Sequence, residues 1–178
     1  MEIHILRLSH RAERDKRVTT HLGLVGRAFG AEKILIGGQR DPHLAESLMK
    51  IVERWGGDFS AEFVKSWRST LKEYKENGWV IAHLTMYGMP VRETAPKVAK
   101  KAGPDGKVLI VVGGEKVPFE VYESSDFNVA VTSQPHSEIS ALAVFLDRLQ
   151  NGLEFDKDFP DAKIAIKPCQ QGKDILTP

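Results

Sequence analysis

Short apolar runs alternate with longer segments of helical period along almost the whole chain. Several of the short runs are unbroken stretches of Val, Ile and Leu, which is typical of parallel strands that are covered on both faces. The pattern predicts an α/β fold with a mostly parallel sheet and helices on both of its faces. The candidate strands are Ile3–Leu8, Lys33–Gly37, Phe59–Val64, Trp79–Leu84, Lys107–Val112, Asn128–Ser133 and Lys163–Lys167.

Apolar residues at three- to four-residue spacing predict helices between these strands. The clearest helix begins at Ser137, a suitable N-cap, carries an apolar stripe as far as Leu149 and is expected to end at Gly152. Pro96 is expected to break a helix that starts as early as Val91. The predicted helical segments are residues 18–29, 44–55, 67–77, 91–101 and 137–149.

Length and composition indicate one domain in a reducing environment. The chain has 178 residues, of which 42% are hydrophobic, enough for one sizeable core. We expect a single domain over residues 1–170 and an irregular C-terminal tail over 171–178. The sole cysteine, Cys169, excludes an internal disulfide, and no Cys/His spacing predicts a metal site. Residues 1–10 do not have the layout of a signal peptide and no apolar run could span a bilayer, so we expect a cytoplasmic protein without a membrane partner.

Basic residues are concentrated near the start of the chain. The whole chain has 25 basic and 24 acidic residues, a formal net charge of +1, yet residues 1–40 contain an excess of Lys and Arg. This segment could contact the phosphates of an RNA. Alternatively it is a solvated loop whose cations pair with Glu13 and Asp15. The clustered basic residues are Arg7, Arg11, Arg14, Lys16 and Arg17.

Four loops that follow predicted strands are candidates for a binding site. They are residues 7–17, 84–88, 113–118 and 132–137. In a parallel sheet all four can project from the carboxyl edge and converge on a crevice for a small polar ligand. Each also has a purely structural interpretation: Gly113–Gly114 would make a tight turn, and Glu115 would stabilise the next helix through its dipole.

The common nucleotide and hydrolase signatures are absent from the sequence. No G-x-G-x-x-G follows the first strand, and there is neither a Walker lysine loop nor a nucleophile elbow. Cys169 lies in a polar tail without a histidine base nearby. Dinucleotide-binding, NTPase and serine or cysteine hydrolase functions are therefore excluded.

Three motifs resemble those of the SPOUT (SpoU-type) RNA methyltransferases. They are TTHLGLVGRAFGA at 19–31, VVGGEKVP at 111–118 and NVAVTSQPHSEISALAVFL at 128–146. More narrowly, RAERDKRVTTH, HLTMYG, GEKVP and QPHSEISALAVFLDRL resemble the archaeal tRNA cytidine-56 2′-O-methyltransferases, over most of residues 3–170. The chain departs from generic SpoU enzymes in having His21 for an asparagine and Ser137–Glu138–Ile139 for Ser-Leu-Asn.

The resemblance implies a specific fold and activity. It implies a SPOUT fold with a deep trefoil knot at the C-terminal end, a homodimer whose sites are completed by the partner, and S-adenosylmethionine as methyl donor. The implied reaction is 2′-O-methylation of cytidine 56 in the T-loop of tRNA. A knotted RNA-binding module of the same fold that lacks catalytic activity is the alternative, and a nucleotide-binding α/β protein unrelated to RNA is a third.

The resemblance also assigns residues to the site. Backbone groups at the strand ends would hold the cofactor, and the cluster Arg7–Arg17 would meet tRNA phosphates. The implied cofactor-binding residues are Leu84, Val112, Gly113, Gly114, Glu115, Lys116, Asn128, Val129, Ala130, Val131, Thr132, Ser133, Gln134 and Pro135.

The implied catalytic residues are Arg27, His21 and His136. By family analogy Arg27 contacts the ribose hydroxyl. A free guanidinium has a pKa of roughly 12.5–13.8, so a fixed cation that stabilises the developing alkoxide is a better role for arginine than a general base. His21 and His136 are alternative proton acceptors, and the sequence leaves the choice between them open.

Overall fold

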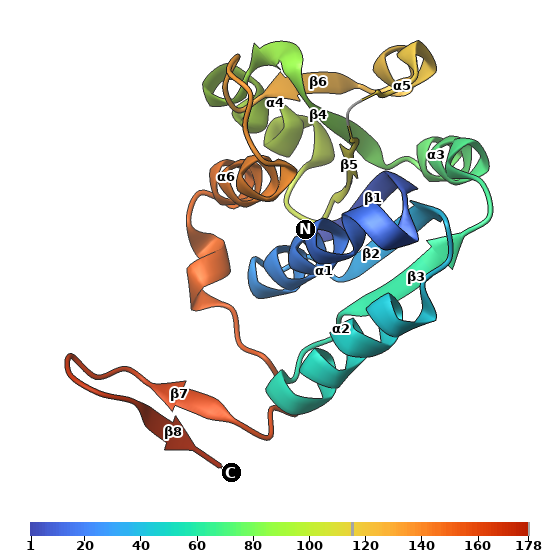
Figure 1. The fold of residues 1–178 in the computed structure, drawn as a ribbon. Helices are drawn as coiled ribbons and strands as arrows, with labels where there is room; N and C mark the ends of the chain where they lie inside the picture. Colours follow the sequence, from blue (N-terminus) through green and yellow to red (C-terminus); the bar gives the residue numbers. More distant parts are fainter. Residues whose placement is uncertain (115, 178) are drawn as a thin grey trace.

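The main sheet of the computed structural model, which describes residues 1–114 and 116–177, has six strands in the order β3-β2-β1-β5-β4-β6 (Figure 1). Every adjacent pair runs parallel. The predicted α/β fold and the positions of these strands are confirmed. Their bounds are β1 Glu2–His10, β2 Lys33–Gly38, β3 Ser60–Val64, β4 Val80–Pro90, β5 Lys107–Val112 and β6 Phe127–Ala130.

The helices agree with the predicted segments but differ at some ends. Helix α1 begins at Ala12, well before the predicted segment. Helix α4 runs through Pro96, contrary to the expected break. Because Arg92 and Pro96 are both exposed, water can satisfy the carbonyl that the proline leaves unbonded. The bounds are α1 Ala12–Ala28, α2 Pro42–Trp55, α3 Trp67–Glu76, α4 Val91–Ala102, α5 Phe119–Ser124, α6 Glu138–Gln150 and the 3-10 turn η1 Leu153–Asp156.

Helices cover both faces of the sheet, as the unbroken apolar strands predict. Helices α1, α2, α4 and α6 pack on the face that carries Ile5 and Ile110. Helices α3 and α5 cover the opposite face, through Leu71 and Val121. Successive residues of a strand point to opposite faces, so β4 presents Ala82 to the first core and Ile81 to the second.

Strands β4 and β6 make an irregular crossing. Val129 of β6 is in register with both Leu84 and Met89 of β4, so residues 85–88 bulge out of the ladder. Gly88 is at the crossing: a Cβ there would lie 2.5 Å from the carbonyl carbon of Asn128 and from the amide nitrogen of Val129. The two backbones can approach this closely only because residue 88 lacks a side chain.

The C-terminal segment differs from the prediction. The run Lys163–Lys167 yields a short strand, β7 Ala165–Lys167, that does not join the main sheet. It pairs antiparallel with β8 Asp174–Leu176, within the tail that was expected to be irregular. The hairpin extends away from the body of the domain (Figure 1). None of the helices in the described part of the chain has the length and apolarity needed to cross a bilayer.

Replacing Gly88 by alanine should destabilise the fold. The added methyl group meets backbone atoms that cannot rotate away, and overpacking of this kind costs about 1–3 kcal/mol. Urea unfolding should therefore show a lower midpoint for Gly88→Ala. Gly114→Ala is the control, because its Cβ would lie 3.7 Å from the nearest atom, Arg7 Nη2. Equal stability of Gly88→Ala and the wild-type protein would contradict the close crossing.

Candidate functional site

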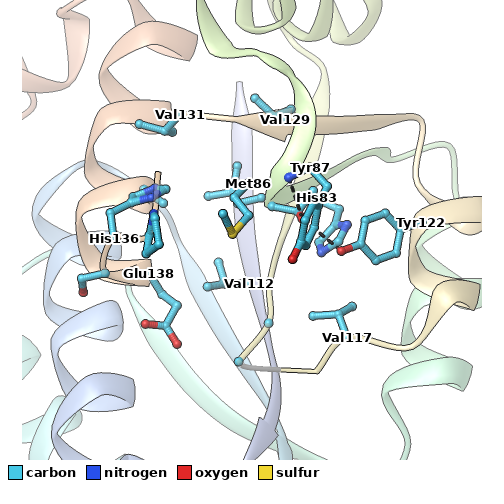
Figure 2. A pocket seen from close by; sticks show the side chains of 17 residues that line it. His83, Met86, Tyr87, Val112, Val117, Tyr122, Val129, Val131, His136 and Glu138 are labelled. Atoms are coloured by element: carbon cyan, nitrogen blue, oxygen red, sulfur yellow. Dashed lines mark hydrogen bonds between the residues drawn. The ribbon is translucent and has the colours of Figure 1, made fainter. Parts of the chain in front are cut away.

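A cavity of about 390 Å³ opens at the carboxyl edge of the sheet (Figure 2). It lies at the bulge of β4, where β5 and β6 end and where α6 begins. Residues of three of the four predicted loops line it, although residues 84–88 lie within β4 rather than in a loop. Its wall combines apolar side chains, among them four valines, with polar side chains on β4, on α5 and at the start of α6. This composition is typical of a site for an organic ligand of moderate size.

Half of the residues predicted to hold a cofactor line this cavity. They are Leu84, Val112, Gly113, Gly114, Val129, Val131 and Pro135. The cavity does not include five others, which lie on β6 or in the loop that follows it. These are Asn128, Ala130, Thr132, Ser133 and Gln134. Lys116 lines a neighbouring cavity, and Glu115 is outside the described residues.

The floor of the cavity is held by a buried arginine. Arg7 is 2% exposed. Its Nη1 donates to the carbonyl oxygen of Gly113 at 2.5 Å and lies 3.5 Å from Oε1 of Glu138. Burial lowers the pKa of the guanidinium, and the Glu138 carboxylate opposes this shift. Arg7 thus connects β1 to the glycine loop after β5 and to the first turn of α6.

The burial of Arg7 corrects its predicted contact with RNA phosphates, since an arginine inside β1 is not available to a polyanion. The other four basic residues of the cluster are exposed on or just before α1. Arg11 pairs with Asp15 through Nε and Oδ2 at 3.1 Å, as the alternative interpretation of a solvated loop expected. Arg11 and Lys116 also line a second cavity, which shares Gly114 with the first.

His136 projects into the cavity from the loop before α6 (Figure 2). Its Nδ1 is 2.7 Å from the carbonyl oxygen of Gln134. Because a carbonyl oxygen can only accept, Nδ1 carries the proton in this bond. In the neutral ring, Nε2 then carries a lone pair that is exposed at the cavity. His21 is exposed on α1 and does not line the cavity.

A polar network lies on the opposite side of the cavity from His136 (Figure 2). His83 Nδ1 is 2.8 Å from Asn128 Oδ1, and Tyr122 Oη is 3.0 Å from Thr85 Oγ1. The His83 and Tyr122 rings meet edge to face with centroids 4.7 Å apart. Burial lowers the pKa of His83.

Arg27 is not brought to this cavity. It lies near the end of α1 and lines a separate cavity with Glu32 and Phe59, which precede β2 and β3 at the amino edge of the sheet. Its Nη2 donates to the carbonyl oxygens of Trp55 at 2.7 Å and Gly56 at 2.5 Å. Within one chain, Arg27 therefore connects α1 to the end of α2, and the role in catalysis that the resemblance implies would require a second copy.

The sequence matches a known family over most of its length. Residues 55–176 fit the family described as tRNA ribose 2′-O-methyltransferase, aTrm56. The tRNA (cytidine(56)-2′-O)-methyltransferase of Thermococcus kodakarensis is 52% identical over 174 residues, which cover 98% of this chain and 96% of the relative. The chain belongs to the aTrm56 family. The resemblance found in the sequence motifs is confirmed.

Solved structures show the same fold as this aTrm56 family member. The TrmH/SpoU tRNA modifying enzyme of A. aeolicus superposes with a TM-score of 0.62 at 14% identity, over 87% of this chain and 77% of that one. The SpoU methyltransferase AviRb of Streptomyces viridochromogenes, solved in complex with AdoMet, gives 0.59 at 12% identity, over 85% of this chain and 58% of that one. At such identities the likeness establishes the fold alone, which is that of the SpoU enzymes.

Sequence reasoning overlooked two groups of this aTrm56 site. His83 lies within the HLTMYG motif, and a histidine inside an apolar strand is a signal of a functional or paired polar group. Tyr122 lies on α5, a helix too short to show a clear periodicity of apolar residues in the sequence. No sequence pattern points to its contact with Thr85.

Arg27→Ala should lower stability, because it removes two hydrogen bonds from a charged, half-buried donor to backbone carbonyls. A hydrogen bond to a charged group contributes about 1.5–3 kcal/mol net of the bonds to water that it replaces, and less when the donor is partly solvated. We expect the free energy of urea unfolding to fall by about 1–3 kcal/mol. Arg54→Ala, an exposed residue on α2, is the matched control and should change little. An Arg27→Ala protein as stable as this control would show that the contact with α2 is unimportant.

Proposed function

We propose that this protein transfers a methyl group from S-adenosylmethionine to the 2′-oxygen of cytidine 56 in tRNA. The observation that carries the proposal is a cavity of cofactor size at the carboxyl edge, in a chain 52% identical to a tRNA (cytidine(56)-2′-O)-methyltransferase. The AdoMet complex of a protein with the same fold also supports S-adenosylmethionine as the donor.

The residues of the cavity fit this cofactor. Apolar walls suit its adenine, and the residues near the start of α6, with the Glu138 carboxylate, suit its charged methionine end. Gly113 must remain small, because a Cβ there would lie 2.1 Å from Cγ2 of Val117. When bound, the cofactor supplies an electrophilic methyl group on a sulfonium. The chain itself must orient the two substrates and accept a proton.

Arg7 is the residue that fixes the glycine loop for this purpose. Its hydrogen bond to the Gly113 carbonyl and its proximity to Glu138 join two walls of the cavity. Buried groups held in this way need little reorganisation when a ligand binds. Arg7, which the sequence assigned to RNA phosphates, is thus proposed to act by positioning the loop.

His136 is the proposed proton acceptor. Its Nδ1–H bond to Gln134 leaves Nε2 free at the cavity, so the ring can take the proton of the ribose hydroxyl as the 2′-oxygen attacks. Between the two histidines that the sequence leaves open, the proposal takes His136, and it is supported by the position of His21 outside the cavity.

The exposed cations near the N-terminus of α1 are the proposed tRNA contacts. Arg11, Arg14, Lys16 and Arg17 are all exposed, and Arg11 lines the cavity adjacent to the cofactor site. Phosphate contacts of this kind weaken as salt is added. The target nucleotide would then enter between this surface and His136.

The proposal also includes a trefoil knot, a homodimer and a cytoplasmic location. The close crossing of Gly88 and β6 supports a knotted passage of residues 128–138 past the bulge of β4. Exposed Tyr87 and Met89, which are 79% and 60% accessible, support coverage by a second copy. A single domain over residues 1–170 and a C-terminal hairpin complete this description.

The main test is methyl transfer to a defined tRNA. We expect the protein to move labelled methyl from S-adenosylmethionine to an unmodified tRNA, and nuclease digestion with mass analysis should locate it on cytidine 56. A matched tRNA with 2′-deoxycytidine at that position lacks the acceptor oxygen and should remain unlabelled. Tight cofactor binding without transfer to any tRNA would favour the non-catalytic RNA-binding alternative.

His136→Gln should lower kcat by about 10²–10⁴-fold, which is the usual contribution of a general base. Affinity for S-adenosylhomocysteine should stay close to that of the wild-type protein, because glutamine preserves the size of the side chain. His21→Gln is the control and should keep its kcat. The opposite result, with His21 essential and His136 dispensable, would refute this assignment.

A further inference from the structure

A buried histidine at the cavity has an unused hydrogen-bond acceptor. His83 on β4 is 0% exposed, and it lines the cavity together with Tyr122. Its Nε2 has no hydrogen-bond partner among the residues that the structure describes. Buried polar atoms are nearly always paired, so an unpaired one at a binding site points to a group on the ligand.

Asn128 determines which ring nitrogen of His83 carries the proton. Nδ2 of Asn128 donates to the carbonyl oxygen of Tyr122 at 3.0 Å, which orients the amide and turns its Oδ1 toward His83. An amide oxygen only accepts, so His83 donates through Nδ1 and Nε2 is left with a lone pair. Burial lowers the pKa of His83 and keeps the ring neutral. The free group is therefore an acceptor and requires a donor.

The surroundings of His83 select the kind of donor. Tyr122 stands edge-on to the ring, its hydroxyl is occupied by Thr85, and Val117 lies on the same side of the cavity (Figure 2). An aromatic wall with one unpaired ring acceptor suits a flat heterocycle that carries an amino group. The charged ammonium of a cofactor is better matched by the Glu138 carboxylate, on the opposite side (Figure 2).

Resting on the proposed function, we propose that His83 Nε2 accepts a hydrogen bond from the 6-amino group of the cofactor's adenine and thereby selects adenine over 6-oxo purines. A 6-oxo purine would present an oxygen at the same place. Two acceptors would then face each other without a proton between them. His83 is in this way a specificity-determining residue that takes no part in the methyl transfer itself.

Calorimetric titration with two ligands tests this assignment. S-adenosylhomocysteine and S-inosylhomocysteine differ in the amino or oxo group at position 6 of the purine and in the proton that N1 carries in the oxo form, and the comparison with His83→Phe isolates the first difference. The wild-type protein should bind the first at least about 10-fold more tightly, as expected when a buried acceptor is left unmatched. In His83→Phe this ratio should fall to about threefold or less. His4→Phe, a matched change of a buried histidine on β1, should keep the wild-type ratio.

A second measurement uses the wild-type protein and does not depend on the folding of a variant. In protein labelled with ¹⁵N-histidine, the unprotonated nitrogen of His83 should move to lower chemical shift when S-adenosylhomocysteine is added, and should not do so with S-inosylhomocysteine. An unmoved resonance with the ligand bound, or equal affinity of the wild-type protein for both ligands, would overturn the role of His83. Failure of S-adenosylhomocysteine to bind at all would instead overturn the proposed function, and the role of His83 with it.

Discussion

The parallel direction of every strand pair in the main sheet is the constraint on which the site depends. Parallel strands bring all their carboxyl ends to one edge, so loops far apart in sequence meet there. The same rule sends each following helix back across the sheet. Helix α1 therefore begins near the carboxyl edge at Ala12 and places Arg27 at the opposite edge. At a rise of 1.5 Å per residue, Ala12 and Arg27 are separated by about 22 Å along the helix axis.

The edge that carries the cavity could be predicted from sequence, but the contacts within it could not. Unbroken apolar runs identify the strands, and strand direction follows from the helices between them. The burial of Arg7 was not predicted, because Arg7 falls both at the end of the predicted strand Ile3–Leu8 and at the start of the predicted basic loop, and only the structure shows that its side chain is enclosed. The position of Arg27 does not follow from its motif alone, because it depends on the length of α1, which begins at Ala12 rather than at the predicted residue 18. The register shift at Gly88 depends on a long-range crossing that leaves no local pattern.

Two buried polar side chains near the cavity, Arg7 and His83, differ in how their hydrogen bonds are satisfied. Arg7 is paired to Gly113 and lies near Glu138, so it stabilises the walls before anything binds. His83 has one ring nitrogen engaged by Asn128 and the other unpaired. In both cases burying polar atoms costs free energy of folding. The fixed dipoles that result lie beside the cavity, where they can orient a ligand.

Hydrogen–deuterium exchange of the wild-type protein with and without S-adenosylhomocysteine tests the central claim most directly. The account predicts slower exchange in peptides that contain residues 84–87, 112–114 and 135–138, which line the carboxyl-edge cavity. It predicts no change around Arg27 and in residues 57–59 and 157–160, which line the cavity at the amino edge. Protection confined to that amino-edge cavity would contradict the placement of the methyl donor.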